Sequence, residues 1–302
     1  MSHDYHLSDT WSLFPNGKYD SAACQCSAVP SAVLSLVIMP DIAVPGAFDH
    51  VVVSVSGVIH TASPFVLEVS DNENNLLQPA IRGTLNIAHT IHTCNPSVRR
   101  LVITSSFAVV LDLDQGFRPT YRYTEADWNP CSYEITQKTS NSSIAYCASR
   151  AFAERYLWEW VTENQPNFTV ATICPPWIFG PTIDVASKRN ESTEVIMNLV
   201  NGSQTEVPEN DFAAFANVED VAQAHLRAYV EDLSAHERFI VAGGAVLVSG
   251  GMRSVPRGIS GTRVKTYIAD GSNAARVLGL EYRNLEETLV ETVEDLQSKD
   301  MV

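Results

Sequence analysis

The chain has 302 residues, 45% of them hydrophobic, so it is long enough for one large domain with an appended lobe or for two domains. A formal charge of −15 argues against nucleic acid binding through general electrostatics. A local basic pocket for a phosphate group is compatible with this net charge. There is no apolar run of about eighteen residues and no basic, apolar start, so we expect no membrane span and no secretory signal. The six scattered cysteines predict reduced thiols in a cytoplasmic chain and no metal site.

Residues 1–33 lack the pattern with which a dinucleotide-binding fold begins. Such a fold opens with an apolar strand, then a glycine-rich turn whose N–H groups approach a pyrophosphate, then a helix. Here the segment has one glycine, Gly17, and two prolines, Pro15 and Pro30. The first β-α-β unit is therefore lost or replaced. The causes left open are an error in the gene model or splicing, a degenerate copy, and a protein that kept a pocket but abandoned the cofactor chemistry.

Strand and helix patterns alternate from residue 33 onward. Apolar and β-branched runs predict strands at 33–39, 57–60, 98–106, 168–173 and 239–242. Apolar spacing predicts helices at 83–91, 146–160, 194–200, 218–230, 274–279 and 285–296. This alternation implies an α/β fold with a doubly wound parallel sheet. His60 ends an apolar run, so we interpret it as a packed, hydrogen-bonded histidine rather than a catalyst.

The strand predicted at 98–106 ends in three residues with hydroxyl groups. Its apolar residues end in Thr104, Ser105 and Ser106, as a buried parallel strand does when its carboxyl end opens onto a site. Any of the three side chains could instead serve only to cap the following turn.

The helix expected at 146–160 carries Tyr146 and Arg150 four residues apart, which puts a phenol and a cation on one face. A nearby cation favours the phenolate and lowers the pKa of a tyrosine. Such a pair could deliver a proton to a developing alkoxide. The helix itself is predicted with one buried face formed by Ala148, Phe152, Tyr156 and Trp160. The alternative to a reactive pair is an amphipathic helix with a surface arginine and a half-buried tyrosine.

The order of these motifs resembles the extended short-chain dehydrogenase/reductases. Within them it is most similar to the fungal aldehyde and ketone reductases related to dihydroflavonol reductase. The resemblance covers the chain from about residue 36 to near its C-terminus. It is carried by residues 40–42, 60–65, 101–106, 125–130, 146–154, 175–181, 217–225 and 278–288.

The resemblance implies a Rossmann-like fold and NADPH-dependent reduction of an aldehyde or ketone to an alcohol, in the setting of fungal secondary metabolism. Ser106 is then expected to hydrogen-bond the carbonyl oxygen, Tyr146 to protonate the alkoxide, and Arg150 to assist it. The implied cofactor-binding residues are Asp41 near the adenine, the turn of Thr61, Ala62 and Ser63, and Thr104, Tyr146, Arg150, Pro175 and Ile178. The implied partner is a small-molecule carbonyl substrate, with NADP as cofactor and a monomer or homodimer as the assembly.

In addition to the missing glycine-rich turn, the sequence departs from the family pattern at two places. Arg150 occupies the place of a lysine that, in relatives, lowers the tyrosine pKa and hydrogen-bonds the nicotinamide ribose. This exchange keeps the charge but changes its shape and aim. A glycine-rich stretch at 243–251 replaces a longer helix of the relatives and is interpreted as flexible turns.

These departures keep two other functions open. The chain could be a remnant without cofactor that binds a ligand but is not catalytic, or a cofactor-independent isomerase or lyase in which Tyr146 is the acid and base. We predict an atypical N-terminal segment at 1–33, a cofactor domain at 34–181, and a region at 182–302 that is mainly substrate lobe and closing helices.

Overall fold

The computed structural model describes residues 37–63, 69–183, 191–203, 212–246 and 265–302. The chain divides into two compact units that are interleaved along the sequence. The first comprises Met1–Val109, Asn129–Thr172 and Ala228–Glu237, and the second comprises Val110–Trp128, Ile173–Arg227 and Arg238–Val302. Each unit is described by itself.

A four-stranded sheet forms the centre of the fold. Its strands are β1 (Gly57–His60), β2 (Arg100–Thr104), β4 (Thr169–Cys174) and β7 (Glu237–Ile240), hydrogen-bonded in the order β1-β2-β4-β7. β1 and β2 are parallel, with His60 opposite Ile103. β2 and β4 are buried along almost their whole length, which explains their continuous apolar sequences.

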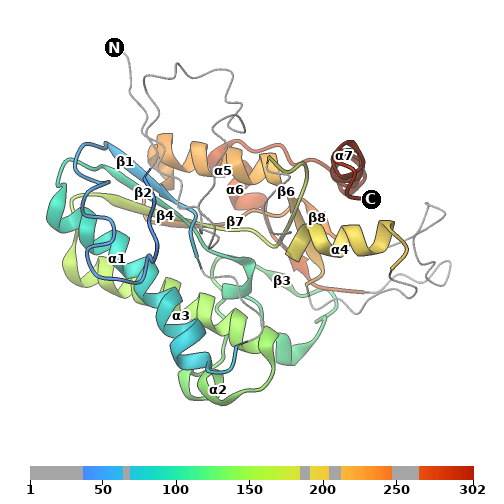
Figure 1. Cartoon of the computed structure of the whole chain (residues 1–302), viewed down its shortest axis with the longest axis horizontal. Helices are drawn as coiled ribbons and strands as arrows, with labels where there is room; N and C mark the ends of the chain where they lie inside the picture. Colours follow the sequence, from blue (N-terminus) through green and yellow to red (C-terminus); the bar gives the residue numbers. More distant parts are fainter. Residues whose placement is uncertain (1–36, 64–68, 184–190, 204–211, 247–264) are drawn as a thin grey trace, which may run out of the picture. The chain divides into compact units, whose positions relative to one another are not determined.

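Helices connect the strands of the first unit. A π-helical turn, Glu73–Leu77, leads into α1 (Gln78–Cys94), which joins β1 to β2. The short helix α2 (Tyr133–Lys138) and the long helix α3 (Ser142–Asn164) precede β4. Asn141 starts α3 by accepting a hydrogen bond from the Ile144 N–H at 3.1 Å. In Figure 1, α1 and α3 run side by side on the same face of β1 and β2.

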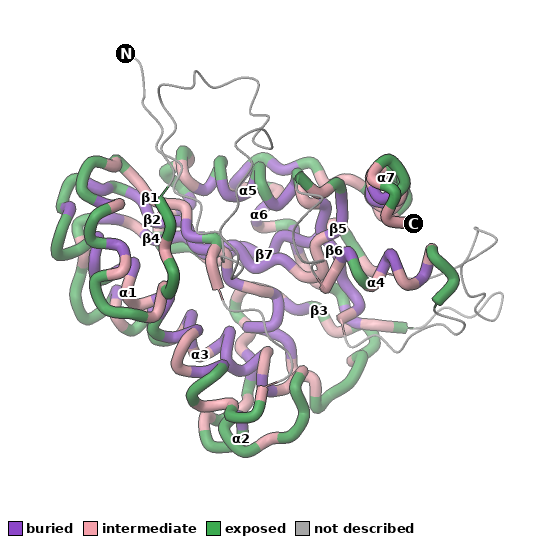
Figure 2. The backbone as a smooth tube through the Cα atoms, viewed as in Figure 1, coloured by how far each residue is buried: buried purple, intermediate pink, exposed green. Residues whose placement is uncertain are grey.

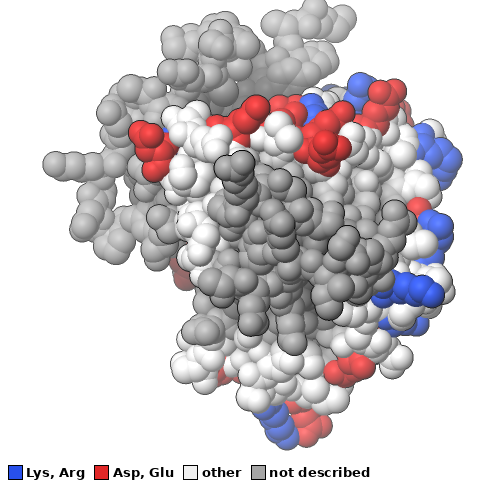
Figure 3. Space-filling view, turned by 90° about the vertical axis from the view of Figure 1, so that its right-hand side faces the viewer, with Lys and Arg blue, Asp and Glu red and all other residues white. Residues whose placement is uncertain are grey.

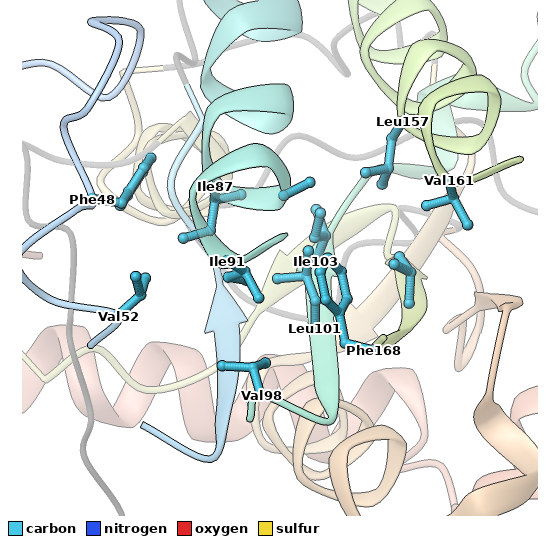
Figure 4. Close-up of a cluster of buried hydrophobic side chains, with 12 residues drawn as sticks. Phe48, Val52, Ile87, Ile91, Val98, Leu101, Ile103, Leu157, Val161 and Phe168 are labelled. Carbon is cyan, nitrogen blue, oxygen red and sulfur yellow. The ribbon is translucent and has the colours of Figure 1, made fainter. Parts of the chain in front are cut away.

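The core of the first unit lies between these two helices and the sheet. Ile87 and Ile91 of α1, Leu101 of β2 and Leu157 of α3 are almost completely buried in one cluster (Figure 4). Burying a side chain of this kind stabilises a fold by roughly 1.5–3 kcal/mol. Figure 2 colours the backbone by burial and shows that the strands are buried, while the helices alternate between buried and exposed positions. This packing fixes α3 against the sheet, and α3 carries the candidate site.

The second unit has two small sheets. β3 (Arg122–Tyr123) pairs in parallel with β9 (Ile268–Ala269), and β5 (Trp177–Phe179), β6 (Ala214–Asn217) and β8 (Gly244–Ala245) pair in that order. Its helices are α4 (Glu191–Val200), α5 (Val218–Val230), which continues into the first unit, α6 (Ser272–Leu278) and α7 (Leu285–Ser298). A capping box between Asn284 and Glu287 starts α7.

Charged side chains form groups on the surface. On the face drawn in Figure 3, acidic groups gather along the upper edge and basic groups along the right-hand edge.

The predicted α/β fold with a parallel sheet is confirmed. The strand predicted at 57–60 and the helix at 218–230 have the observed bounds, and the other elements named here differ from their predictions by a few residues at their ends. Residues 1–33, where the first β-α-β unit is in question, lie outside the described residues, as does most of the glycine-rich stretch at 243–251. In the described chain, no strand precedes β1.

Two local expectations are wrong. The strand predicted at 33–39 is not formed in its described part, 37–39. The buried face expected on α3 is also wrong, because Tyr156 is 38% exposed and Phe152 and Trp160 are half-buried. The buried line instead includes Arg150, Glu154, Leu157 and Val161. Hydrophobic spacing missed it because two of its residues are charged, and these side chains are buried with polar partners from the strands.

Candidate active site

Two predicted groups of residues lie at one edge of the sheet. Since β1 and β2 are parallel and His60 is opposite Ile103, the residues after both strands leave the sheet at the same edge. Thr61, Ala62 and Ser63 follow β1, and Ser105 and Ser106 follow β2. The carboxyl edge of a parallel sheet is where ligands bind in open α/β folds.

Ser106 and Tyr146 are joined at this edge. The side chains of Ser106, after β2, and Tyr146, in the second turn of α3, form a hydrogen bond. Burial raises the pKa of Tyr146 above its ordinary value, and both the charge of Arg150 and the Ser106 hydrogen bond oppose that rise. The phenol is therefore protonated at neutral pH and has a hydroxyl group and a cation beside it.

The geometry separates Ser106 from Ser105. The Ser105 hydroxyl donates to the carboxylate of Glu154 and is buried, whereas Ser106 meets Tyr146 and also accepts a hydrogen bond from the Ala108 N–H at 3.2 Å. Of the two serines, only Ser106 therefore has a hydroxyl next to the candidate proton donor.

Arg150 is buried, with 6% of its surface exposed, so it is not the surface arginine of the alternative interpretation. One terminal nitrogen donates to the Ser63 hydroxyl, and the other donates to the Thr104 carbonyl at 2.9 Å. Both partners are neutral. The Nε atom is buried and has no hydrogen-bond partner in the part of the chain that the structure describes. Among the described residues no carboxylate forms an ion pair with Arg150, so the arginine brings to the site a positive charge that is not ion-paired there.

His60 lies near this charge and is packed, as expected. It is 4% exposed and meets Phe48 edge-to-face at 5.6 Å. Burial and, to a smaller extent, the charge of Arg150 lower the pKa of His60 to about 4. The imidazole is therefore neutral at physiological pH, and its Nε2 has no partner among the described residues.

Other predicted cofactor residues are not drawn into this cluster. Asp41 is exposed and accepts a hydrogen bond from the Ala43 N–H at 2.8 Å, which is a local turn contact. Thr61 is exposed and Ala62 half-buried, both directly after β1. Pro175 and Ile178 belong to the second unit, where Pro175 is buried and Ile178 lies on β5.

Sequence reasoning missed Glu154. It is 3% exposed and accepts hydrogen bonds from Ser105, from Thr172 at 3.0 Å and from Trp158 Nε1 at 3.1 Å. The signal was its spacing, because Tyr146, Arg150 and Glu154 follow one another at intervals of four residues on one helix face.

The described residues hold no group of three or more His, Cys, Asp or Glu side chains that could bind a metal ion. Cys94, Cys131, Cys147 and Cys174 are free thiols. None of the helices in the described ranges has the length and apolar character that crossing a membrane would need.

The residues at the sheet edge fit the nicotinamide and ribose part of a nicotinamide cofactor. Such a group offers several hydroxyl oxygens to a protein. Ser63 and Tyr146 supply hydroxyls, and the partnerless Nε–H of Arg150 is a buried donor. The pyrophosphate part cannot be tested in this way, because the segment at 1–33 lies outside the described residues.

The fold and this Ser–Tyr–Arg arrangement define a class, the Rossmann-like dehydrogenases and reductases, and comparison with known proteins identifies the family. Residues 21–249 match the 3-beta hydroxysteroid dehydrogenase/isomerase family, and the chain belongs to that family. This confirms the resemblance to the extended short-chain dehydrogenase/reductases.

Individual relatives agree with this assignment. The NADPH-dependent methylglyoxal reductase of Saccharomyces cerevisiae is 33% identical over 87% of this chain and 83% of its own length. A cinnamoyl-CoA reductase of Medicago truncatula is 35% identical over 84% of this chain and 77% of its own. The solved structure of the yeast methylglyoxal/isovaleraldehyde reductase complexed with NADPH matches with a TM-score of 0.77 and 30% identity, covering 90% of this chain and 86% of that one.

Proposed function

We propose that this protein is an NADPH-dependent reductase that converts a small aldehyde or ketone to an alcohol. The observation that carries the proposal is the junction of Ser106, Tyr146 and Arg150, because it combines two hydroxyl groups and a buried cation at the carboxyl edge of the sheet. The family and the reductases among its relatives support the same reaction.

In this proposal, NADPH supplies the hydride when it is bound. The Ser106 hydroxyl donates a hydrogen bond to the substrate carbonyl oxygen and stabilises the negative charge that develops on it. Tyr146 gives its proton to the same oxygen. Because burial raises the pKa of Tyr146, the phenol still holds that proton at neutral pH, as a general acid in the direction of reduction requires.

Arg150 has two roles in the proposed reaction. Its positive charge stabilises the phenolate that remains after proton transfer, since charge interactions are stronger in a site that excludes water. Its Nε–H is a buried donor without a partner in the described residues and is available to a cofactor hydroxyl, while one N–H of each terminal nitrogen bonds Ser63 or Thr104. We assign Asp41, Thr61, Ala62, Ser63, Thr104, Pro175 and Ile178 to cofactor binding as part of this proposal.

The substrate class follows the relatives. Methylglyoxal and isovaleraldehyde, after which the yeast reductase is named, are therefore the first compounds to test. A place in fungal secondary metabolism and a cytoplasmic location stay predictions.

Titration of the purified protein with NADPH, by fluorescence and calorimetry and with NADH as comparison, tests the proposal before any substrate is chosen. We expect micromolar binding of NADPH, followed by oxidation of NADPH when methylglyoxal or isovaleraldehyde is added. An absence of binding up to millimolar cofactor would overturn the reductase function. A cofactor-free remnant or isomerase would then be the better description.

A further inference from the structure

Three consecutive residues, the last residue of β2 and the two that follow it, contact a single face of α3. The Thr104 carbonyl accepts from Arg150, the Ser105 hydroxyl donates to Glu154, and the Ser106 hydroxyl bonds Tyr146. The helix residues are spaced by four, so they lie along one face, about 6 Å apart at each step. The position of Ser106 relative to Tyr146 thus depends on the two contacts beside it.

Glu154 is the most connected of these anchors. One carboxylate oxygen, Oε2, accepts from Ser105, while the other, Oε1, accepts from Thr172 on β4 and from Trp158 on α3 itself. A carboxylate has no other way to be buried at low cost, because each unmet oxygen would forfeit its hydration. Its contacts therefore join β2, β4 and α3 at one buried point.

We propose that Glu154 is a positioning residue that, through the Ser105 hydroxyl, holds the Ser106 hydroxyl against Tyr146. Glu154 acts on no substrate or cofactor atom. Its effect passes through one peptide unit, from Ser105 to Ser106. The role of the pair as reacting groups rests on the proposed function, but the positioning itself does not.

The two carboxylate oxygens allow a matched set of variants. Ser105→Ala removes the donor to Oε2 and leaves Glu154, Thr172 and Trp158 unchanged. Thr172→Val replaces the hydroxyl with a methyl group and removes a donor to Oε1, so it disturbs the same carboxylate without touching the strand end that carries Ser106. Glu154→Gln removes the charge, and Ser106→Ala gives the reference state in which the hydrogen bond to Tyr146 is lost.

The first readout is the ¹³Cζ signal of Tyr146 at neutral pH in protein labelled on its ten tyrosines, assigned by its loss in Tyr146→Phe. This measurement needs no cofactor. Two titratable groups that act on Tyr146, Arg150 and Cys147, lie on α3 and are retained in every test variant. We expect Ser105→Ala and Glu154→Gln to move the signal toward its position in Ser106→Ala, and Thr172→Val to leave it at the wild-type position.

The second readout is kinetic. With carbonyl substrate, Ser105→Ala is expected to lower kcat about tenfold, since small displacements of reacting groups reduce rates by such factors. The Kd of NADPH should change less than twofold, and Thr172→Val should keep the wild-type kcat.

The outcomes distinguish the positioning role of Glu154 from the proposed reductase function. If the Ser105→Ala signal stays at the wild-type position while Ser106→Ala moves it, the positioning role is overturned. The positioning role also fails if Thr172→Val moves the signal as much as Ser105→Ala, since Glu154 would then be a general structural anchor. If the signals move as expected but no variant and no wild-type protein oxidises NADPH, the positioning role stands and the proposed function fails.

Discussion

Arg150 in the first unit and Arg283 in the second both form hydrogen bonds through their guanidinium groups, but the partners of Arg150 are neutral and those of Arg283 are carboxylates. The partners of Arg150 are a hydroxyl and a carbonyl, and the side chain is buried. Arg283 bonds Asp220 at 2.6 Å, pairs with Glu219, and lies 3.9 Å from Glu291, with its side chain 33% exposed. In the part of the chain that the structure describes, carboxylates pair with Arg283, whereas none pairs with Arg150.

The tyrosines near the two arginines show the consequence. Burial raises the pKa of Tyr146 and of Tyr282. Around Tyr146 the charge of Arg150 opposes that rise, but around Tyr282 the carboxylates of Asp220 and Glu125 add to it. Neighbouring charges therefore favour the phenolate of Tyr146 and disfavour that of Tyr282, as expected for a cation that is not ion-paired in the described residues and for a cluster with several carboxylates.

The largest effect is expected from Tyr146→Phe, which keeps the ring and removes the proton. Loss of a general acid lowers rates by roughly 10²–10⁴-fold, so reduction should fall by at least about 100-fold with little change in NADPH affinity. Tyr156→Phe, which changes an exposed tyrosine further along the same helix, is the matched control and should be neutral. Steady-state kinetics provide the measurement, and an unchanged rate in Tyr146→Phe would remove this phenol from the mechanism.

Arg150 tests the importance of a charge that is not ion-paired in the described residues. Arg150→Met removes it with similar bulk, and we expect kcat to fall about 30-fold because the phenolate loses its cation. Arg150→Lys restores the family residue and keeps the charge, so it should match or exceed the wild-type rate. Stopped-flow reduction rates distinguish the two variants. A fall in Arg150→Lys as large as that in Arg150→Met would show that the two-pronged contact to Ser63 and Thr104, and not the charge, is what matters.

Much of this site could be predicted from sequence because its chemistry follows local patterns. A hydroxyl run at the end of an apolar strand pointed to Thr104, Ser105 and Ser106, the family resemblance selected Ser106 among them, and a spacing of four linked Tyr146 with Arg150. The predicted contact of Ser63 with this region rested on family resemblance, and the structure brings its hydroxyl to Arg150.

Other features depend on tertiary contacts that sequence spacing does not encode. The alternative interpretation placed Arg150 on the surface because charged side chains are rarely buried without partners, and its partners come from positions 46 and 87 residues away. Glu154 was missed for the same reason, since its donors Ser105 and Thr172 come from two different strand segments. Hydrophobic periodicity placed the buried face of α3 on its aromatic residues. In the structure the buried residues of α3 include Arg150 and Glu154, which form buried polar contacts.

His60 gives a way to detect the charge of Arg150 through stability. The folded-state pKa of about 4 lies below the ordinary value of 6.5, so between these values the unfolded chain binds more protons and stability falls as the pH falls. The loss between pH 7 and pH 5 amounts to about 2 kcal/mol. His60→Gln should flatten this dependence in urea unfolding measured at the two pH values.

The control for that measurement is His89→Gln, which removes an exposed imidazole from α1. If His60→Gln leaves the pH dependence of unfolding as steep as it is in the wild-type protein and in His89→Gln, His60 does not titrate in the way proposed. Arg150→Met with His60 retained should flatten the dependence by less than His60→Gln does, because the charge of Arg150 is the smaller of the two causes that lower the pKa of His60.

The smallest effect on kcat is expected from Arg283→Met, which should instead lower the stability of the fold. The Asp220 side chain is 3% exposed, so losing its arginine leaves a buried carboxylate with fewer donors, and a hydrogen bond to a charged group contributes about 2 kcal/mol to stability. Unfolding should be easier by about that amount, while kcat per folded molecule stays within about twofold of wild type. Arg276→Met, which changes an exposed arginine whose contact is the neutral Asn273, should change neither quantity. If Arg283→Met instead lowered kcat as strongly as Arg150→Met, an ion-paired cation would matter as much to the reaction as Arg150, and the distinction between the two arginines would fail.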